Sequence, residues 1–69
     1  MRIEINILTP TEAYIYVDTG DPYKLTSSAG YYWKLFDASM NELRRWKNKD
    51  GQTVKDALPE ALRIVFLQK

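Results

Sequence analysis

The chain contains no cysteine and no histidine. Without cysteine there can be no disulfide, no thiolate metal site and no thiol nucleophile. Without histidine the chain lacks the commonest general base, the commonest metal ligand and the side chain that titrates near neutral pH. Ser-His-Asp sites, Cys-His sites and the common zinc sites are therefore excluded. We expect a protein that is not an enzyme, with no catalytic residue, no cofactor and no metal.

Long apolar runs and a large net charge are missing as well. No segment is apolar over enough residues to span a bilayer. The 69 residues carry ten basic and nine acidic side chains, a net charge of +1, whereas a dedicated nucleic-acid-binding protein is usually visibly basic. We expect a single small domain over residues 1–69, cytoplasmic or virion-associated, near the lower size limit for an ordinary hydrophobic core.

The first half of the chain predicts β-structure. Residues 2–8 alternate isoleucine with polar residues, and residues 13–18 alternate again after the turn sequence Thr9-Pro10-Thr11-Glu12. Two alternating runs joined by four turn residues indicate an antiparallel hairpin. Residues 19–30 contain two breaks and no periodicity, which predicts a mobile loop. The aromatic run over residues 31–36 predicts a third strand.

Residues 37–49 fit two interpretations. The sequence Ser39-Met40-Asn41-Glu42 matches the capping box that begins many helices, and apolar residues follow at three-residue spacing. The alternative is a hairpin whose turn covers residues 37–41 and whose second strand covers residues 42–46. We predict the helix, near residues 39–49.

The end of the chain completes the predicted sheet. Thr53-Val54-Lys55-Asp56 can open a short helical turn, which Pro59 ends or bends. Residues 62–67 are almost continuously apolar, as in a central strand covered on both faces. One helix can cover one face, so the second cover would come from a loop or from another molecule. The predicted fold class is α+β, a small mainly antiparallel sheet of about four strands (2–8, 13–18, 31–36, 62–67) with one helix near 39–49 packed on one face.

One motif suggests catalysis. Asp18-Thr19-Gly20 is the signature of aspartic proteases and follows a predicted strand. That chemistry needs two such aspartates sharing a proton, and here Asp21 and Pro22 follow where those proteases usually have a small residue. We interpret the motif as a strand-end turn, in which Asp18 accepts local N–H bonds and Gly20 takes a positive φ.

Aromatic and basic side chains predict binding to another protein or to a second copy of the chain. Tyrosine and arginine are enriched at the centres of such interfaces. We predict a small non-enzymatic protein-interaction module, an inhibitor, adaptor or assembly subunit of the kind that phages and mobile elements encode. The alternative is a weak nucleic-acid-binding module that uses the basic run 44–49. The residues predicted to make the contact are Tyr14, Tyr16, Tyr31, Trp33, Arg44, Arg45 and Lys47.

Residues 36–67 carry a further pattern. An aromatic strand ends in a carboxylate, a tryptophan follows about ten residues later, and a leucine-proline step leads into an apolar segment. The residues are Phe36-Asp37, Trp46, Leu58-Pro59-Glu60-Ala61 and Arg63-Ile64-Val65-Phe66. This half of the chain resembles the C-terminal part of the J-type minor pseudopilins of type II secretion systems. The resemblance implies a β-rich tip domain that works by assembly, a periplasmic location, and the hairpin interpretation of residues 37–46.

Overall fold

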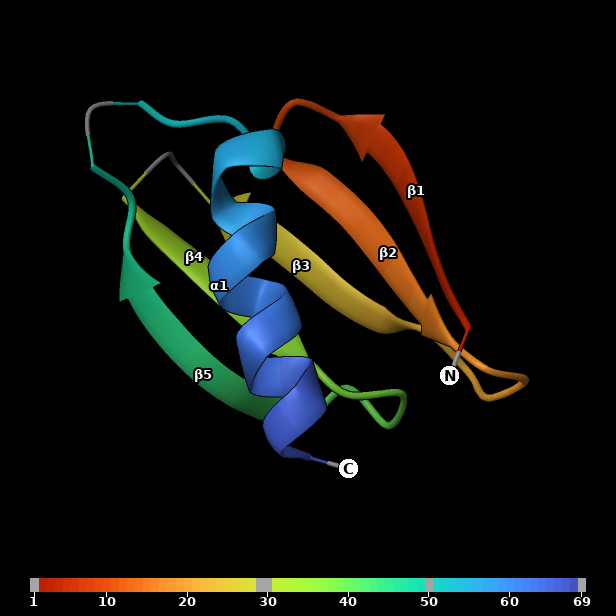
Figure 1. Ribbon diagram of the computed structural model, residues 1–69. Helices are drawn as coiled ribbons and strands as arrows, with labels where there is room; N and C mark the ends of the chain where they lie inside the picture. Colours follow the sequence, from red (N-terminus) through yellow and green to blue (C-terminus); the bar gives the residue numbers. More distant parts are fainter. Residues whose placement is uncertain (1, 29–30, 50, 69) are drawn as a thin grey trace.

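Five strands and then one helix follow one another along the chain (Figure 1). The computed structural model describes residues 2–28, 31–49 and 51–68. The elements are β1 (Ile3–Thr9), β2 (Glu12–Val17), β3 (Tyr23–Ser28), β4 (Tyr32–Phe36), β5 (Glu42–Lys47) and α1 (Val54–Leu67).

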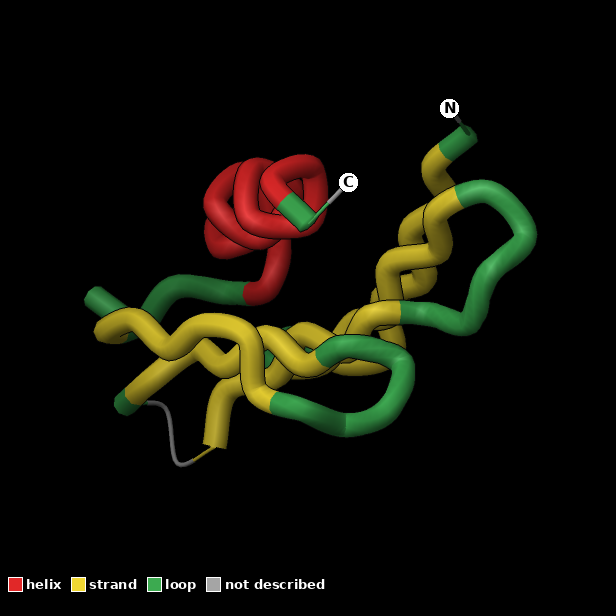
Figure 2. Tube along the Cα trace, turned by 90° about the horizontal axis from the view of Figure 1, so that it is seen from below, coloured by secondary structure: helices red, strands yellow, loops and turns green. Residues whose placement is uncertain are grey.

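The strands form one antiparallel sheet in the order β1-β2-β3-β4-β5, so each strand pairs with its neighbours in sequence. The helix α1 crosses one face of the sheet and packs chiefly over β3. Figure 2 shows the helix on one side only, with the opposite face of the sheet left bare by the described residues. The predicted α+β class, an antiparallel sheet with one helix on one face, is confirmed with five strands in place of about four.

The first hairpin lies where the alternating sequence predicts it. Ile3, Ile5 and Ile7 of β1 stand opposite Val17, Ile15 and Ala13 of β2, respectively. All six side chains therefore point to the face that carries α1. The strand predicted over residues 31–36 is also present, as β4.

One strand was missed. Tyr23–Ser28 forms β3, where a mobile loop was predicted over residues 19–30; residues 29 and 30 of that loop lie outside the described residues. Leu25 is the single aliphatic residue of β3, so its alternation is weak in the sequence. The strand pairs with β2 on one side and β4 on the other, and this two-sided pairing overrides the low β-propensity of its polar residues.

The helix predicted near residues 39–49 was wrong, and the hairpin alternative was right, because β5 occupies this segment. Asp37 builds the turn. Its Oδ1 atom accepts hydrogen bonds from the backbone N–H groups of Ser39 and Asn41, both at 2.9 Å. Such side-chain-to-backbone bonds compete with helix formation. Met40 has a φ of 65°, a left-handed conformation that cannot continue a right-handed helix.

The strand predicted over residues 62–67 was also wrong, because this segment belongs to α1. The apolar stripe is longer than the last six residues and recurs at i, i+3 and i+4 from Val54 onward, as in a helix with one buried side. Pro59 does not end the helix. It removes only the N–H group that would bond the carbonyl of Lys55. Since residues 62–67 are helical, they need no cover on a second face.

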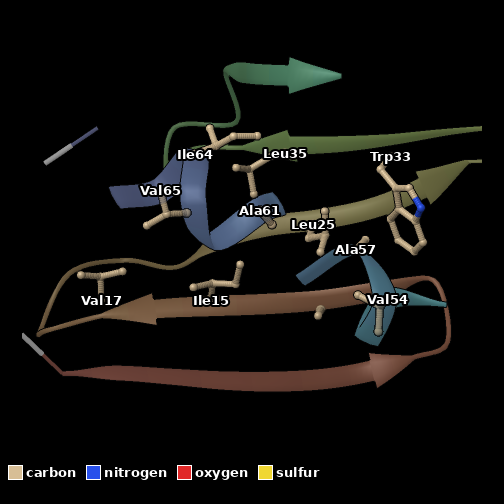
Figure 3. Close-up of a cluster of buried hydrophobic side chains, with 11 residues drawn as sticks. Ile15, Val17, Leu25, Trp33, Leu35, Val54, Ala57, Ala61, Ile64 and Val65 are labelled. Carbon is tan, nitrogen blue, oxygen red and sulfur yellow. The ribbon is translucent and has the colours of Figure 1, made fainter. Parts of the chain in front are cut away.

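The helix and the sheet bury a common apolar core (Figure 3). Ala57 and Ala61 are small, so α1 can lie close to the sheet. Ile64 points toward Leu35 on β4, whereas Val65 points toward β2. The largest fully buried side chains are those of Trp33, Ile15, Leu25, Leu35, Ile64, Val54 and Val65.

The start of α1 is held by three sets of hydrogen bonds. The Val54 N–H donates to the carbonyl of Pro10, in the turn between β1 and β2, at 2.7 Å. The N–H of Thr53 donates to the Asp56 carboxylate at 3.1 Å, which caps the first turn. Before them, the buried Asn48 accepts a bond from the Gln52 N–H at 2.9 Å and orders the loop after β5. These bonds place the helix over the sheet.

Candidate interaction surface

The sheet face opposite α1 gathers aromatic and charged side chains from all five strands. Side chains alternate along a strand, so the residues between the core positions point to this side. The register sets their neighbours, with Tyr14 opposite Lys24 and Lys34 opposite Arg45. We call this surface the open face. It includes Glu4, Asn6, Glu12, Tyr14, Tyr16, Lys24, Thr26, Tyr32, Lys34, Phe36, Arg45 and Lys47.

Four aromatic residues of the open face are partly accessible. Tyr14 and Tyr16 on β2 are half-buried, as is Phe36 on β4, and Tyr32 is 47% exposed. No helix covers these rings in the described part of the chain, so their partial burial comes from neighbouring side chains of the sheet. A tyrosine in this position offers apolar area together with a hydroxyl group that can still bond a partner.

Charge is unevenly distributed across the open face, with acidic side chains on β1 and β2 and mainly basic ones on β3, β4 and β5, where Glu42 stands opposite Phe36 and pairs with Arg45 at 3.1 Å. Glu12 and Lys24 form an ion pair at 3.3 Å, with side chains 31% and 26% exposed. Lys34 and Lys47 have no carboxylate within ion-pair distance among the described residues. Glu4 pairs with Arg2 at 2.6 Å, so the charge left unpaired on the open face among the described residues is that of Lys34 and Lys47, which can orient a partner with acidic groups.

The structure brings four of the seven predicted contact residues to the open face: Tyr14, Tyr16, Arg45 and Lys47. Tyr31 lies in the turn before β4 and is 70% exposed. The remaining two point to the helix side. Arg44 stands opposite Leu35, and Trp33 is completely buried under α1. Trp33 fills the core and is not available to a partner.

Sequence reasoning missed the residues that β4 contributes to the open face, which are Tyr32, Lys34 and Phe36. The signal that could have found them is the alternation of β4. Trp33 and Leu35 are the bulky residues that fill the core, so the residues between them must point the other way. Choosing Trp33 as a contact residue selected the core side of this strand.

The Asp-Thr-Gly motif forms a turn at the end of β2. Asp18 has a φ of 55° and is itself the left-handed residue of the turn. Its Oδ1 atom accepts a hydrogen bond from the Arg2 N–H at 2.9 Å, which ties the start of β1 to the end of β2. The strand-end interpretation holds, with two corrections. The positive φ belongs to Asp18 and not to Gly20, and the bonded N–H comes from a distant part of the chain.

Two further findings bear on function. In the described ranges, no three acidic, histidine or cysteine side chains come close enough together to hold a metal ion. Within the same ranges, no helix has the length and apolar character needed to cross a membrane. Comparison with protein families, with curated proteins and with solved structures found no match. The pseudopilin resemblance therefore stays a prediction.

Proposed function

We propose that this protein is a non-enzymatic interaction module that binds another protein through its open face. The observation that carries the proposal is the placement of Tyr14, Tyr16 and Tyr32 on the sheet face that no described helix covers. In a chain this short, aromatic residues on the bare side add nothing to the core under α1. Aromatic residues are enriched at protein interfaces, where they supply buried area at low entropic cost.

The charge pattern supports a partner with acidic groups on its contact surface. Lys34 and Lys47 are free of ion pairs among the described residues, so they can bond carboxylates of an incoming surface. The partner we propose is a protein whose contact surface is acidic where it meets β4 and β5 and contains apolar area where it meets Tyr14 and Tyr16. Charge-assisted bonds at the rim would set orientation and association rate, and the tyrosines would supply most of the affinity.

The test is affinity capture with the immobilised chain, followed by titration calorimetry with the captured protein after purification. The variant is Tyr14→Thr with Tyr16→Thr, which removes both rings and keeps β-branched residues suited to a strand. The control is Phe66→Gln, which removes a ring that is 48% exposed on α1. We expect binding to be lost in the double variant and kept in the control. A captured protein that binds both variants equally would refute the open face as its site.

A second candidate function is binding of single-stranded nucleic acid. It is favoured by one observation, the grouping of Tyr32 with Lys34, Arg45 and Lys47 on the open face, because bases stack on aromatic rings while cations contact phosphates. Fluorescence anisotropy with a labelled oligonucleotide tests it. This function requires affinity that falls steeply with salt and that drops in Arg45→Ala with Lys47→Ala. Absence of binding at low salt would remove this candidate.

A further inference from the structure

The free edge formed by β1 carries backbone groups with no strand partner among the described residues. The Asp18 N–H donates to the carbonyl of Arg2 at 2.8 Å. Backbone bonding in an antiparallel pair alternates from residue to residue, so the bonds to β2 are made by Arg2, Glu4 and Asn6. The N–H and C=O groups of Ile3, Ile5 and Ile7 consequently point away from the sheet.

The opposite edge of the sheet, β5, is protected more fully than residues 3–7 of β1. It bears the cations Arg44, Arg45 and Lys47, and its pairing with β4 is interrupted by a bulge beside Phe36. Charges and bulges are the devices by which edge strands avoid pairing with another chain. β1 has an irregularity of its own between Ile7 and Thr9, but its register runs without a break from Ile3 to Ile7, the stretch that would pair. The edge of β1 is therefore ready for strand pairing, and the edge of β5 is not.

Apolar side chains accompany this free edge. Ile5 and Ile7 point to the helix side but are each 40% exposed, and Leu8 is 49% exposed. The reason is the position of α1 over β3, which leaves β1 uncovered (Figure 1). Near Ile7, an open hollow of about 370 Å³ separates β1 from the start of α1. Its lining is Ile7, Leu8, Thr9, Pro10, Thr53, Val54 and Lys55.

We propose that β1 is a self-association edge, which pairs antiparallel with β1 of a second copy about a two-fold axis at Ile5. In this register Ile5 faces Ile5 of the second copy, and Ile3 faces Ile7, so each of the three isoleucines meets an isoleucine. On the other side of the strand Glu4 faces Asn6. All three isoleucines also have their N–H and C=O groups directed at the partner, as hydrogen-bonded pairs require.

The neighbouring registers are less complementary. An axis at Glu4 would set two carboxylates opposite each other, which destabilises strand pairing. An axis at Asn6 would set Glu4 opposite Leu8 and leave Ile3 opposite Thr9. The net charge of +1 gives two copies little mutual repulsion. A self-complementary strand with low net charge fits a second copy of the same chain, since a two-fold interface presents one surface to itself.

The resulting dimer would have one continuous ten-stranded sheet. A two-fold axis perpendicular to the sheet leaves both helices on the same side and both open faces on the other. The edge of β1 and the open face are separate surfaces, so self-association goes beyond the proposed function. A test can refute one of these two proposals and leave the other standing.

The first test is molar mass by size-exclusion chromatography with light scattering across a wide concentration range. We expect the wild-type mass to rise toward twice the 8.1 kDa of one chain. Ile5→Lys places a charge at the axis and should stay monomeric, whereas the control Phe66→Lys adds the same charge on α1 and should dimerise as the wild type does. A wild-type monomer at every concentration would overturn the proposal and leave the edge to an extended segment of another protein. Dimerisation of folded Ile5→Lys would overturn it too.

A second measurement tests the register in which the two copies of β1 would pair. It does not depend on the folding of Ile5→Lys. The chain has no cysteine, so Ile5→Cys and Asn6→Cys each give a single thiol. Directly opposed hydrogen-bonded residues lie about 5.5 Å apart between Cα atoms, within disulfide range. Under mild oxidation Ile5→Cys should therefore form the disulfide-linked dimer faster than Asn6→Cys. Equal rates, or faster linkage of Asn6→Cys, would overturn the axis at Ile5.

Discussion

The backbone N–H of Val54 donates a hydrogen bond of 2.7 Å to the carbonyl oxygen of Pro10. The first N–H groups of a helix have no partner inside the helix, and here one of them joins α1 to the turn between β1 and β2. The bond fixes the start of the helix relative to the sheet. It also orders the turn beside the free edge of β1.

Replacing Val54 with proline should destabilise the protein more than replacing it with alanine. Proline normally suits the first position of a helix, but here it removes the N–H that bonds Pro10. Val54→Ala should cost about 2 kcal/mol for the buried side chain, and Val54→Pro about 1 kcal/mol more for the lost bond. Urea denaturation of the two variants measures the difference. Equal stabilities would show that this hydrogen bond contributes nothing to the fold.

Acid should weaken the turn between β4 and β5 through Asp37. Its pKa is held below the ordinary value, chiefly by the hydrogen bond from the Asn41 backbone and against the opposing effect of desolvation. A carboxyl group with a lowered folded-state pKa stabilises the fold above its unfolded-state pKa. That contribution is lost as the pH falls through the folded-state pKa. Asp37→Ala should therefore be less stable than the wild type at pH 7, and the difference should narrow in acid.

Denaturant titrations at a series of pH values, from neutral to strongly acidic, measure this effect. The control is Asp21→Ala, which removes an exposed carboxylate. The pKa of Glu60 is also lowered, mainly by its hydrogen bond from Arg63, but Glu60 is present in every protein compared and cancels in the differences. A difference between the wild type and Asp37→Ala that stays constant with pH would contradict the role given to the ionised carboxylate.

Met40→Gly should stabilise the protein. Met40 has a φ of 65° and a side chain that is 58% exposed, so glycine relieves backbone strain and removes little packing. We expect a gain of about 0.5–1 kcal/mol. Gly51 has the same φ with open space around it, so Gly51→Ala serves as the reverse control and should lose a similar amount. Thermal unfolding measures the midpoint of each variant relative to the wild type. Midpoints that shift in the same direction for Met40→Gly and Gly51→Ala would refute this interpretation.

Ser27→Ala should leave stability unchanged or raise it by up to about 1 kcal/mol. The Ser27 hydroxyl is buried opposite Trp33, and neither it nor the Trp33 indole N–H has a hydrogen-bond partner among the described residues. Removing a buried polar group that makes no bond removes only its desolvation cost. Urea denaturation measures the change. A loss above about 1 kcal/mol would show that the hydroxyl is bonded after all.

The parts of the fold predicted correctly are those in which one local signal dominates. Alternating isoleucines identify β1, and the alternation around Ile15 identifies β2, because one face of each strand is apolar. Of the three wrong assignments, the helix near residues 39–49 and the strand over residues 62–67 arose where a local signal was followed too far, and the loop over residues 19–30 where β3 has almost no local signal. The Ser39–Glu42 box resembles a helix start, but Asp37 uses the same N–H groups for a turn. The real cap is formed by Thr53 and Asp56.

The prediction of the site depended on these assignments. Tyr14 and Tyr16 were placed correctly as neighbours on one face, because β2 was recognised. Arg44 and Arg45 were grouped as one basic run, whereas a strand sends consecutive side chains to opposite faces. The bareness of the open face follows from the position of α1, and that position depends on contacts between Val54 and Pro10 that no local pattern contains.

The order of the elements has a consequence for synthesis and truncation. All strand pairings join sequence neighbours, so the sheet can assemble by successive hairpins, which favours rapid folding. The helix comes last in the sequence and supplies Val54, Ala57, Ala61, Ile64 and Val65 to the core. During translation, therefore, the five strands and their apolar face are synthesised before the helix that covers this face. A chain that stops before residue 54 would expose both this apolar face and the unpaired edge of β1. This combination is prone to aggregation.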